Sequence, residues 1–382
     1  MSASAFSSDA PSSGWRSLLP EGWREVLAGL GADDATLSRI ETHTDSANAA
    51  ASPARTGPVV PGRIMRAEHS LATVLTPAGP VRASLPPAEP VCAGDWVLTT
   101  LTDPLVTTVL PRRTALARHA SGNKTVSQIL AANVDDVFIT VAADRGVSLD
   151  RIERFLALVW ESGAAPVVVL TKRDLLAPAA ATPLLTAAMG AAPGAEVYLV
   201  SAVTGEGIDE LSERFQPGRT AALIGSSGAG KSSLLNALAG AEVAATAEVR
   251  EADGKGKHKT AWRELVVLDQ GGAIIDTPGL RGLGLWLDGG GLDATFADIT
   301  ELAAGCRFAD CHHDTEPGCA VTAAIESGEL AARRLASYRK LEREAAFVAR
   351  KADVRARHAE ARAFAVRARQ AQARTRQPSR YS

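Results

Sequence analysis

Short apolar runs separated by helical patterns occupy the middle of the chain, from about residue 113 to residue 288. The runs cover residues 137–141, 167–170, 197–200, 221–224, 265–268 and 273–275. Continuous apolar runs of this length are typical of strands that are buried on both faces of a sheet. Segments with a helical pattern, such as residues 149–160 and 232–238, lie between them. The alternation predicts an α/β, doubly wound nucleotide-binding sheet.

A different pattern, of short β-prone runs between prolines and glycines, precedes this region. Its runs are residues 70–75, 81–85, 95–101 and 107–110. Five or so short strands predict an OB-type barrel, which can present one face to single-stranded or irregular nucleic acid. Arginines that would then contact phosphates are Arg63, Arg66, Arg82, Arg112 and Arg113. The alternative is a barrel that only packs beside the next domain.

The two ends of the chain carry weaker patterns. Residues 1–55 indicate a weakly ordered leader around a possible short helix at residues 23–30, and residues 44–62 are typical of a linker. Near the other end, residues 330–377 lack glycine and proline, which predicts a helix. Its apolar stripe is Leu335, Tyr338, Leu341, Ala345 and Val348. Basic residues expected to face outward are Arg333, Arg334, Arg339, Lys340 and Arg343.

Composition fits a soluble chain of two or three domains, with 382 residues of which 46% are hydrophobic and 22% charged. No apolar run is long enough to span a bilayer, and residues 1–13 lack the basic start and apolar core of a secretory signal. Residues 331–382 carry 15 Lys/Arg against 4 Asp/Glu, which leaves 26 against 39 elsewhere. This asymmetry favours a polyanion partner, with a solvated helix face as the alternative. We expect a cytoplasmic protein without membrane contact.

Residues 225–232 carry the phosphate-binding P-loop motif, since they follow an apolar run and open a helical pattern. Backbone N–H groups of such a loop, with the start of its helix, wrap the phosphates of a nucleoside triphosphate. Lys231 would reach the outer phosphates, and the hydroxyl of Ser232 would bind Mg²⁺. The residues assigned to this part of the site are Gly225, Ser226, Ser227, Gly228, Ala229, Gly230, Lys231, Ser232 and Ser233.

Two loops that precede the P-loop predict guanine as the base. The carboxylate of Asp174 can accept hydrogen bonds from N1–H and the 2-amino group of guanine, a donor pair that adenine lacks. Lys172 would lie along the base plane, and the backbone N–H of Ala202 would bind guanine O6. A generic surface turn is the alternative for the first loop. The residues assigned to the base site are Thr171, Lys172, Arg173, Asp174, Ser201 and Ala202.

The segment Asp276-Thr-Pro-Gly279 follows the last apolar run and is expected to sense the third phosphate. Asp276 would hold Mg²⁺, and the N–H of Gly279 would approach the γ-phosphate. Residues 254–260 form a polar, glycine-rich segment suited to a switch, in which the hydroxyl of Thr260 would complete the magnesium shell. A plain solvent loop is the alternative. The run Gly289-Gly-Gly291 is expected to act as a hinge.

Three of the four cysteines lie close together with a histidine. Cys306, Cys311, His313 and Cys319 offer three thiolates and one imidazole, enough for a closed, structural zinc site. The adjacent His312 competes with His313 as the nitrogen ligand. The alternative to a metal site is a set of buried or reactive cysteines.

The order of these motifs is permuted, because the base loops precede the P-loop, whereas ordinary GTPases carry them in the opposite order. Three further segments accompany this order: Gly-x-His-x-Thr260, Asp276-Thr-Pro-Gly-Leu280 with Gly-Leu-Trp286, and Leu130-Ala-Ala-Asn-Val134. Together they resemble the RsgA family of circularly permuted GTPases, which act in small ribosomal subunit biogenesis. The resemblance covers about residues 60–350.

The resemblance implies an OB-type barrel, a circularly permuted P-loop GTPase domain and a C-terminal zinc-binding helical domain. It implies GTP with Mg²⁺ and one structural Zn²⁺, and it favours His313 over His312 as a ligand. His258 matches the switch histidine that is proposed to orient the attacking water in similar proteins. Leu280 stands where many GTPases place a glutamine for that purpose, so slow hydrolysis that ribosomes stimulate is expected.

We therefore predict five segments: a leader and linker (1–56), an OB barrel (57–112), a permuted GTPase domain (113–290), a zinc-binding domain (291–350) and a basic tail (351–382). We expect a monomer that cycles between GTP and GDP, binds the small ribosomal subunit and its rRNA, helps its late maturation and leaves after hydrolysis. Two rival functions are a nucleotide-gated rRNA-binding module with little turnover and a permuted GTPase of the large subunit.

Overall fold

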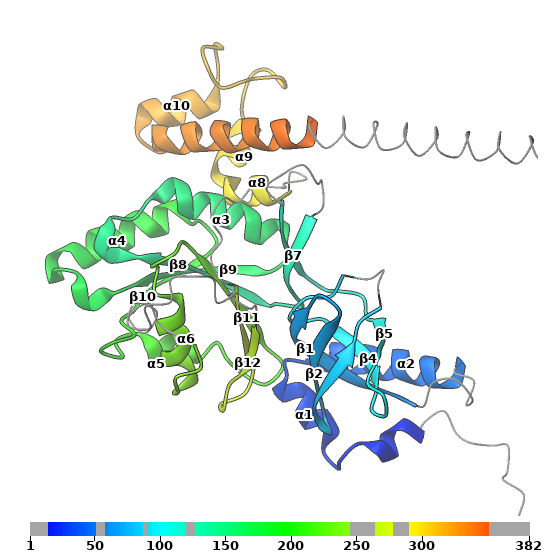
Figure 1. Cartoon of the computed structure of the whole chain (residues 1–382). Coiled ribbons are helices and arrows are strands. Elements are labelled where there is room, and N and C mark those ends of the chain that lie inside the picture. Colours follow the sequence, from blue (N-terminus) through cyan, green and yellow to red (C-terminus); the bar gives the residue numbers. More distant parts are fainter. Residues whose placement is uncertain are drawn as a thin grey trace, which may run out of the picture.

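The described part of the chain forms a small barrel, a central six-stranded sheet with helices on both faces, and a helical C-terminal module (Figure 1). The structure is a computed structural model that describes residues 14–50, 58–86, 90–119, 127–244, 264–277 and 290–350. The predicted site residues His258, Thr260 and Gly279 lie outside these ranges. Within them, no helix is both long and apolar enough to cross a membrane.

The central sheet has the strand order β10-β9-β8-β11-β13-β12. Its strands are β8 (Asp136–Ala142), β9 (Ala165–Thr171), β10 (Glu196–Leu199), β11 (Thr220–Gly225), β12 (Glu264–Val267) and β13 (Ala273–Asp276). All neighbours are parallel except the edge strand β12, which runs antiparallel to β13. The carboxyl ends of the five parallel strands therefore meet at one edge, where a doubly wound sheet binds its ligand.

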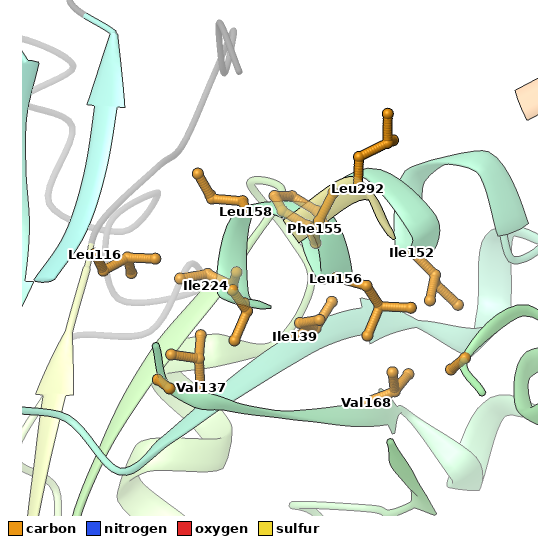
Figure 2. Close-up of a cluster of buried hydrophobic side chains, with 14 of the residues drawn as sticks. Leu116, Val137, Ile139, Ile152, Phe155, Leu156, Leu158, Val168, Ile224 and Leu292 are labelled. Carbon is orange, nitrogen blue, oxygen red and sulfur yellow. The ribbon is translucent and has the colours of Figure 1, made fainter. Parts of the chain in front are cut away.

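Both faces of this sheet are buried, which explains the continuous apolar runs. Along β8, the side chain of Phe138 joins one hydrophobic cluster, whereas those of Val137 and Ile139 join another on the opposite face. The helices α5 (Ile208–Ser212) and α6 (Lys231–Ala239) cover the Phe138 face. On the other face, Phe155 and Leu156 of α3 (Leu149–Glu161) pack over the strands (Figure 2). Helix α4 (Pro178–Ala191) lies beside α3.

The N-terminal sheet has the antiparallel order β3-β2-β1-β4-β5. Its strands are β1 (Val59–Glu68), β2 (Leu71–Thr76), β3 (Gly79–Ser84), β4 (Trp96–Thr100) and β5 (Val106–Val109). A bridge between Ser84 and Leu105, with the N–H of Ser84 2.9 Å from the carbonyl oxygen of Pro104, joins the two edge strands. The sheet thus closes on itself, and the predicted OB-type barrel is confirmed.

The expectation of a weakly ordered leader and a linker at residues 44–62 is wrong for the described residues. The segment forms η1 (Gly14–Leu18), α1 (Trp23–Gly29), which is the short predicted helix, and α2 (Asp34–Ala50), and β1 already begins at Val59. Leu27 and Ile40 pack with Trp96 of the barrel. The polar composition misled the prediction because hydroxyls of α2, such as that of Thr44, bond to carbonyls one turn back and so fit inside a helix.

Two of the barrel arginines, Arg63 and Arg112, are structural rather than phosphate-facing, and Arg113 is engaged by two acids, which corrects part of the predicted nucleic-acid surface. Arg63 is 0% exposed, and its guanidinium donates to the carbonyl oxygens of Leu30, Gly94 and Asn133 and to the hydroxyl of Thr220. Burial lowers its pKa to about 9. Arg112 forms two hydrogen bonds with the buried Asp95, and Arg113 bridges Asp33 and Asp135. Arg66 and Arg82 reach the surface and share Glu68.

A hairpin connects the barrel to the central sheet, and Arg63 fixes their relative position. The hairpin strands are β6 (Ala115–His119) and β7 (Ser127–Ala132). Arg63 belongs to β1 of the barrel, Asn133 follows β7, and Thr220 begins β11, the strand that leads into the P-loop. One buried side chain therefore ties the barrel to the strand that carries the phosphate loop.

The C-terminal module packs on α3 (Figure 1). It comprises α8 (Gly290–Thr295), α9 (Ala297–Ala303), α10 (Ala320–Ser327) and a helix over residues 332–350. Within the last helix, Leu335 and Leu341 of the predicted stripe are buried, and the ring of Tyr338 meets that of Phe296 edge-on at 5.4 Å. The predicted stripe is confirmed from Leu335 to Ala345, which also packs against the core.

The outward orientation predicted for the basic residues of this helix is wrong for Arg334, which is 3% exposed. Its guanidinium donates to Glu153 on α3 and to Asp298 on α9, and it lies over the ring of Phe296. Arg333 also pairs with Glu153. Glu153 on α3 is 0% exposed. A buried carboxylate needs an oppositely charged partner, and the last helix supplies it with Arg334.

The predicted glycine hinge is also corrected within the described residues. Gly290 and Gly291 begin α8, and the backbone N–H of Gly291 donates to Glu161 Oε2 at 2.8 Å. A β carbon on Gly291 would collide with the backbone carbonyl of Ala157. The glycine therefore permits two helices to touch.

Candidate nucleotide and metal sites

The P-loop spans the turn between β11 and α6. It needs glycine for two reasons, the missing side chain and the left-handed backbone. A β carbon on Gly225 would collide with the backbone carbonyl of Thr140, so the loop approaches β8 more closely than other residues allow. Gly228 and Gly230 have φ of 78° and 85°, the left-handed region that favours glycine. Ser227 and Gly228 are exposed at the loop's tip, whereas Ser232 and Ser233 are half-buried in the first turn of α6.

Lys231 is 8% exposed, and its Nζ donates to the carbonyl oxygens of Gly225 and Ser226, at 3.0 Å each. The ammonium group thus lies under the loop that is expected to wrap the phosphates. Because a P-loop lysine acts on phosphate as a point charge, this position fits the role that the sequence predicts for it.

Thr171, at the end of β9, contacts the P-loop. Its buried hydroxyl donates to the carbonyl oxygen of Ala229 at 2.7 Å. A hydroxyl has one hydrogen to donate, so this bond leaves none for the base N7, the contact that an asparagine at this position would make. Thr171 instead joins the base loop to the phosphate loop.

Asp174 of the first base loop lies beside Ser201 of the second, as expected if both loops contact the same base. The Ser201 hydroxyl donates to Asp174 Oδ1 at 2.6 Å and accepts the backbone N–H of Thr204 at 3.1 Å. Asp174 is exposed and Ala202 half-exposed, so both can reach a ligand. The backbone N–H of Arg173 donates to the carbonyl of Val200, and its guanidinium lies 3.4 Å from Glu206. Arg173 therefore joins the two loops.

One residue near the base loops escaped the sequence analysis. Asp144 follows β8 in a short turn, η2 (Ala143–Arg145), and its Oδ2 lies 3.0 Å from Lys172 Nζ. The parallel pairing of β8 with β9, in which Ala142 faces Thr171, brings the two residues together. A signal was available, since an acid directly after a buried strand falls at the carboxyl edge of the sheet.

Asp276 ends β13 and pairs in register with Leu223 of β11, close to the P-loop in the sheet. The next residue, Thr277, is buried and donates its hydroxyl to the carbonyl oxygen of Leu223. This bond holds the start of the Asp276-Thr-Pro-Gly279 segment against the P-loop strand. The magnesium roles of Ser232 and Asp276 remain predictions.

The Cys₃His group is brought together as predicted. Ligand atoms of Cys306, Cys311, His313 and Cys319 all lie within 4.8 Å of one another. His313 Nδ1 is 3.5 Å from the sulfurs of Cys306 and Cys319, which are 3.9 Å apart. Tetrahedral Zn²⁺, with bonds of about 2.3 Å to sulfur and about 2.0 Å to nitrogen, separates such atoms by about 3.8 Å and about 3.5 Å. The distances among Cys306, His313 and Cys319 therefore match a zinc site, and Cys311 offers a fourth ligand atom within 4.8 Å of theirs.

The loop around this group selects His313 rather than His312. His313 has φ of 60°, which turns its ring toward the sulfurs. The backbone N–H of His312 is held by Glu316 at 2.9 Å. Burial raises the pKa of the Cys319 thiol, but hydrogen bonds from Thr322 and His313 outweigh burial and lower it to about 6. This favours the thiolate of Cys319, the form that binds metal, whereas burial and the neighbouring thiols raise the pKa of Cys311 to about 11.

The permuted order of a P-loop, two base loops and a Cys₃His group on one chain defines the class as a circularly permuted P-loop GTPase. Residues 109–286 match the family model described as RsgA GTPase. The small ribosomal subunit biogenesis GTPase RsgA of Streptomyces coelicolor is 50% identical over 311 residues, which are 78% of this chain and 84% of that relative. The chain belongs to the RsgA family and is a GTPase.

Other relatives and solved structures agree. The protein of the same name from Streptomyces avermitilis is 49% identical over 305 residues, covering 78% of this chain and 82% of the relative. The crystal structure of YjeQ from Thermotoga maritima superposes with a TM-score of 0.57 at 26% identity, covering 75% of this chain and 98% of that one. YloQ, a circularly permuted GTPase, shares the fold with a TM-score of 0.55, covering 77% of this chain and 98% of its own.

Proposed function

We propose that this GTPase binds the small ribosomal subunit through its rRNA, helps late maturation and leaves when GTP is hydrolysed. The observation that carries the proposal is the high identity to relatives named for small-subunit biogenesis, over a stretch as long as 311 residues. The structure adds that base loops, P-loop and Asp276 share one edge of the sheet. The proposed partner places the protein in the cytoplasm, and we expect a monomer.

The experiment compares GTP turnover of the protein alone, with purified small subunits and with large subunits. We expect slow turnover alone and stimulation by small subunits. Stimulation confined to large subunits would replace the proposal with the large-subunit rival. Nucleotide-dependent binding to small subunits without turnover would favour the gated RNA-binding module.

Within the nucleotide site, we propose that Asp174 reads guanine and that Lys231 and the P-loop backbone hold the phosphates. Ser232, Thr260 and Asp276 would hold Mg²⁺, which would neutralise charge on the phosphates. Replacing Asp174 by asparagine exchanges an acceptor for a donor that suits the second carbonyl of xanthine. The D174N variant should lose GTP affinity and gain XTP affinity in calorimetry, while a shared loss for both would contradict the assignment.

We propose that His258 orients the attacking water, since Leu280 cannot do so. H258A should then lower kcat in the presence of small subunits while leaving the Kd for GTP unchanged. An equal loss of kcat in a variant of the neighbouring Lys257 would remove the specific role of the histidine.

A further inference from the structure

The pair formed by Asp144 and Lys172 lies at the carboxyl edge of the sheet, beside the base loop. Lys172 Nζ is 3.0 Å from Asp144 Oδ2, and the side chains are 27% and 17% exposed. The pair is therefore better shielded from water than most surface ion pairs, whose contribution is small. Arg145, the other base near this carboxylate, is 78% exposed and 3.8 Å away.

Lys172 is held at both ends of its side chain. Its backbone has φ of 63°, a left-handed conformation that is uncommon outside glycine, and Asp144 fixes its Nζ. The four methylenes between these points follow a restricted path. A free lysine side chain loses rotamer entropy when it is ordered. Ordering before the nucleotide arrives removes part of that cost from binding.

The hydrogen bonds of Asp144 argue against a purely structural role. Its Oδ1 is buried and finds no hydrogen-bond partner among the residues that the structure describes. A structural carboxylate usually has its oxygens satisfied, since a buried acceptor without a donor lowers stability. Here the carboxylate directs one oxygen at Lys172, while the other has no donor in the described part of the chain and stays available for a ligand or water.

We propose that Asp144 is a positioning residue for guanine-nucleotide binding, which holds the stem of Lys172 in the path that lies along the base. The inference rests on the proposed role of Lys172 at the base. Because the stem contacts the base and not the phosphates, Asp144 contributes equally to GTP and GDP binding. It acts through Lys172 and leaves the hydrolytic step unchanged.

The test measures Kd for GTP and GDP by calorimetry, and kcat at saturating GTP, in the full-length protein. We expect Asp144→Ala and Asp144→Asn to weaken both affinities by about three- to tenfold at unchanged kcat. In a Lys172→Ala background, Asp144→Ala should have no further effect. Arg145→Ala, which removes the exposed neighbour, is the matched control and should bind as the parent does.

Three results would overturn the inference. Tighter binding by D144A would mean that the pair holds Lys172 away from the base. An undiminished loss in the Lys172→Ala background would mean that Asp144 acts by another route, including misfolding, which the isosteric D144N variant and its unfolding curve would reveal. Unchanged affinity in Lys172→Ala alone would show that Lys172 does not contribute to binding, and this inference would fail with it. The proposed recognition of guanine by Asp174 would not be affected.

Discussion

Arg334 and Glu153 form a buried ion pair between the C-terminal helix and α3, with 2.9 Å between Arg334 Nη1 and Glu153 Oε1. Asp298 lies 2.7 Å from the same guanidinium, and Phe296 covers its face. Burial opposes the charge of Arg334, but Asp298 and Glu153 outweigh burial and raise its pKa. The pair therefore fixes the C-terminal module on the domain that carries the P-loop.

Removal of Glu153 should loosen this attachment. Glu153→Ala leaves two arginines without their shared acceptor, and loss of one partner of a buried pair costs about 3 kcal/mol. Urea unfolding should show a separate early transition of the C-terminal module. Adding Arg334→Met should recover part of the loss, whereas Lys340→Ala, at an exposed pair with Asp150, should cost about 0.5 kcal/mol or less. Equal losses in the two single variants would contradict this account.

Gly291→Ala tests the close contact of α8 with α3. The added β carbon would lie 2.8 Å from the backbone nitrogen of Glu161 and would also meet the carbonyl of Ala157. Since backbone atoms cannot move aside cheaply, we expect a loss of about 2 kcal/mol in unfolding free energy. Gly290→Ala is the control, because a β carbon there meets nothing within 4 Å. If both variants unfold like the parent, the packing is looser than described.

The two adjacent histidines should differ in metal binding. H313A removes a ligand of the Cys₃His group, while H312A removes a ring that lies outside it. Elemental analysis should find about one zinc per chain in the parent and in H312A, and a strongly reduced content in H313A. Chelation should lower the melting temperature of the parent, because zinc affinity contributes folding free energy. Retention of zinc in H313A with loss in H312A would reverse the assignment.

Thr171→Val should weaken nucleotide binding because the Thr171 hydroxyl bonds to the P-loop. The substitution keeps the shape but leaves the carbonyl of Ala229 without its 2.7 Å donor. Loss of a buried hydrogen bond costs about 1–2 kcal/mol. Because the bond supports the P-loop that binds the phosphates, we expect a roughly tenfold loss of affinity for both GTP and GDP. Thr171→Ser, which retains the hydroxyl, should bind like the parent. Identical affinities for the valine and serine variants would refute the coupling.

Acid should weaken the contact between η1 and α2. Hydrogen bonds from Arg16, at 2.9 Å, and from Trp15, at 2.8 Å, lower the pKa of Asp45 below its usual 3.8. This contribution to stability is present above pH 3.8 and is lost as pH falls through the lower folded value. The stability difference between the parent and Asp45→Asn, from unfolding curves at several pH values, should therefore shrink below pH 3.8. A difference independent of pH would show that the charge of Asp45 is irrelevant.

Local sequence signals predicted the parts of the fold that depend on neighbouring residues in the chain. The apolar runs gave the strands of the central sheet because both faces are buried, and the P-loop glycines meet a local backbone requirement. The spacing of the cysteines likewise identified the Cys₃His group, which a short loop brings together.

Features that depend on contacts between distant segments were missed. Arg63 looked like a surface base because its β-prone neighbours do not reveal that Leu30, Asn133 and Thr220 surround it. Arg334 was predicted to lie on the surface because its partner Glu153 is far away in the sequence. Lys172 was placed at the base, but Asp144 becomes its neighbour only through the pairing of β8 with β9.

The burial of Arg63 has a mechanical consequence. Arg63 joins the barrel to the start of β11, and Arg334 with Gly291 joins the C-terminal module to α3. The central sheet domain therefore sets the spacing between its two flanking parts. A partner that touches both must offer contact points at a matching separation. A partner of a different shape could then contact one flanking part but not both.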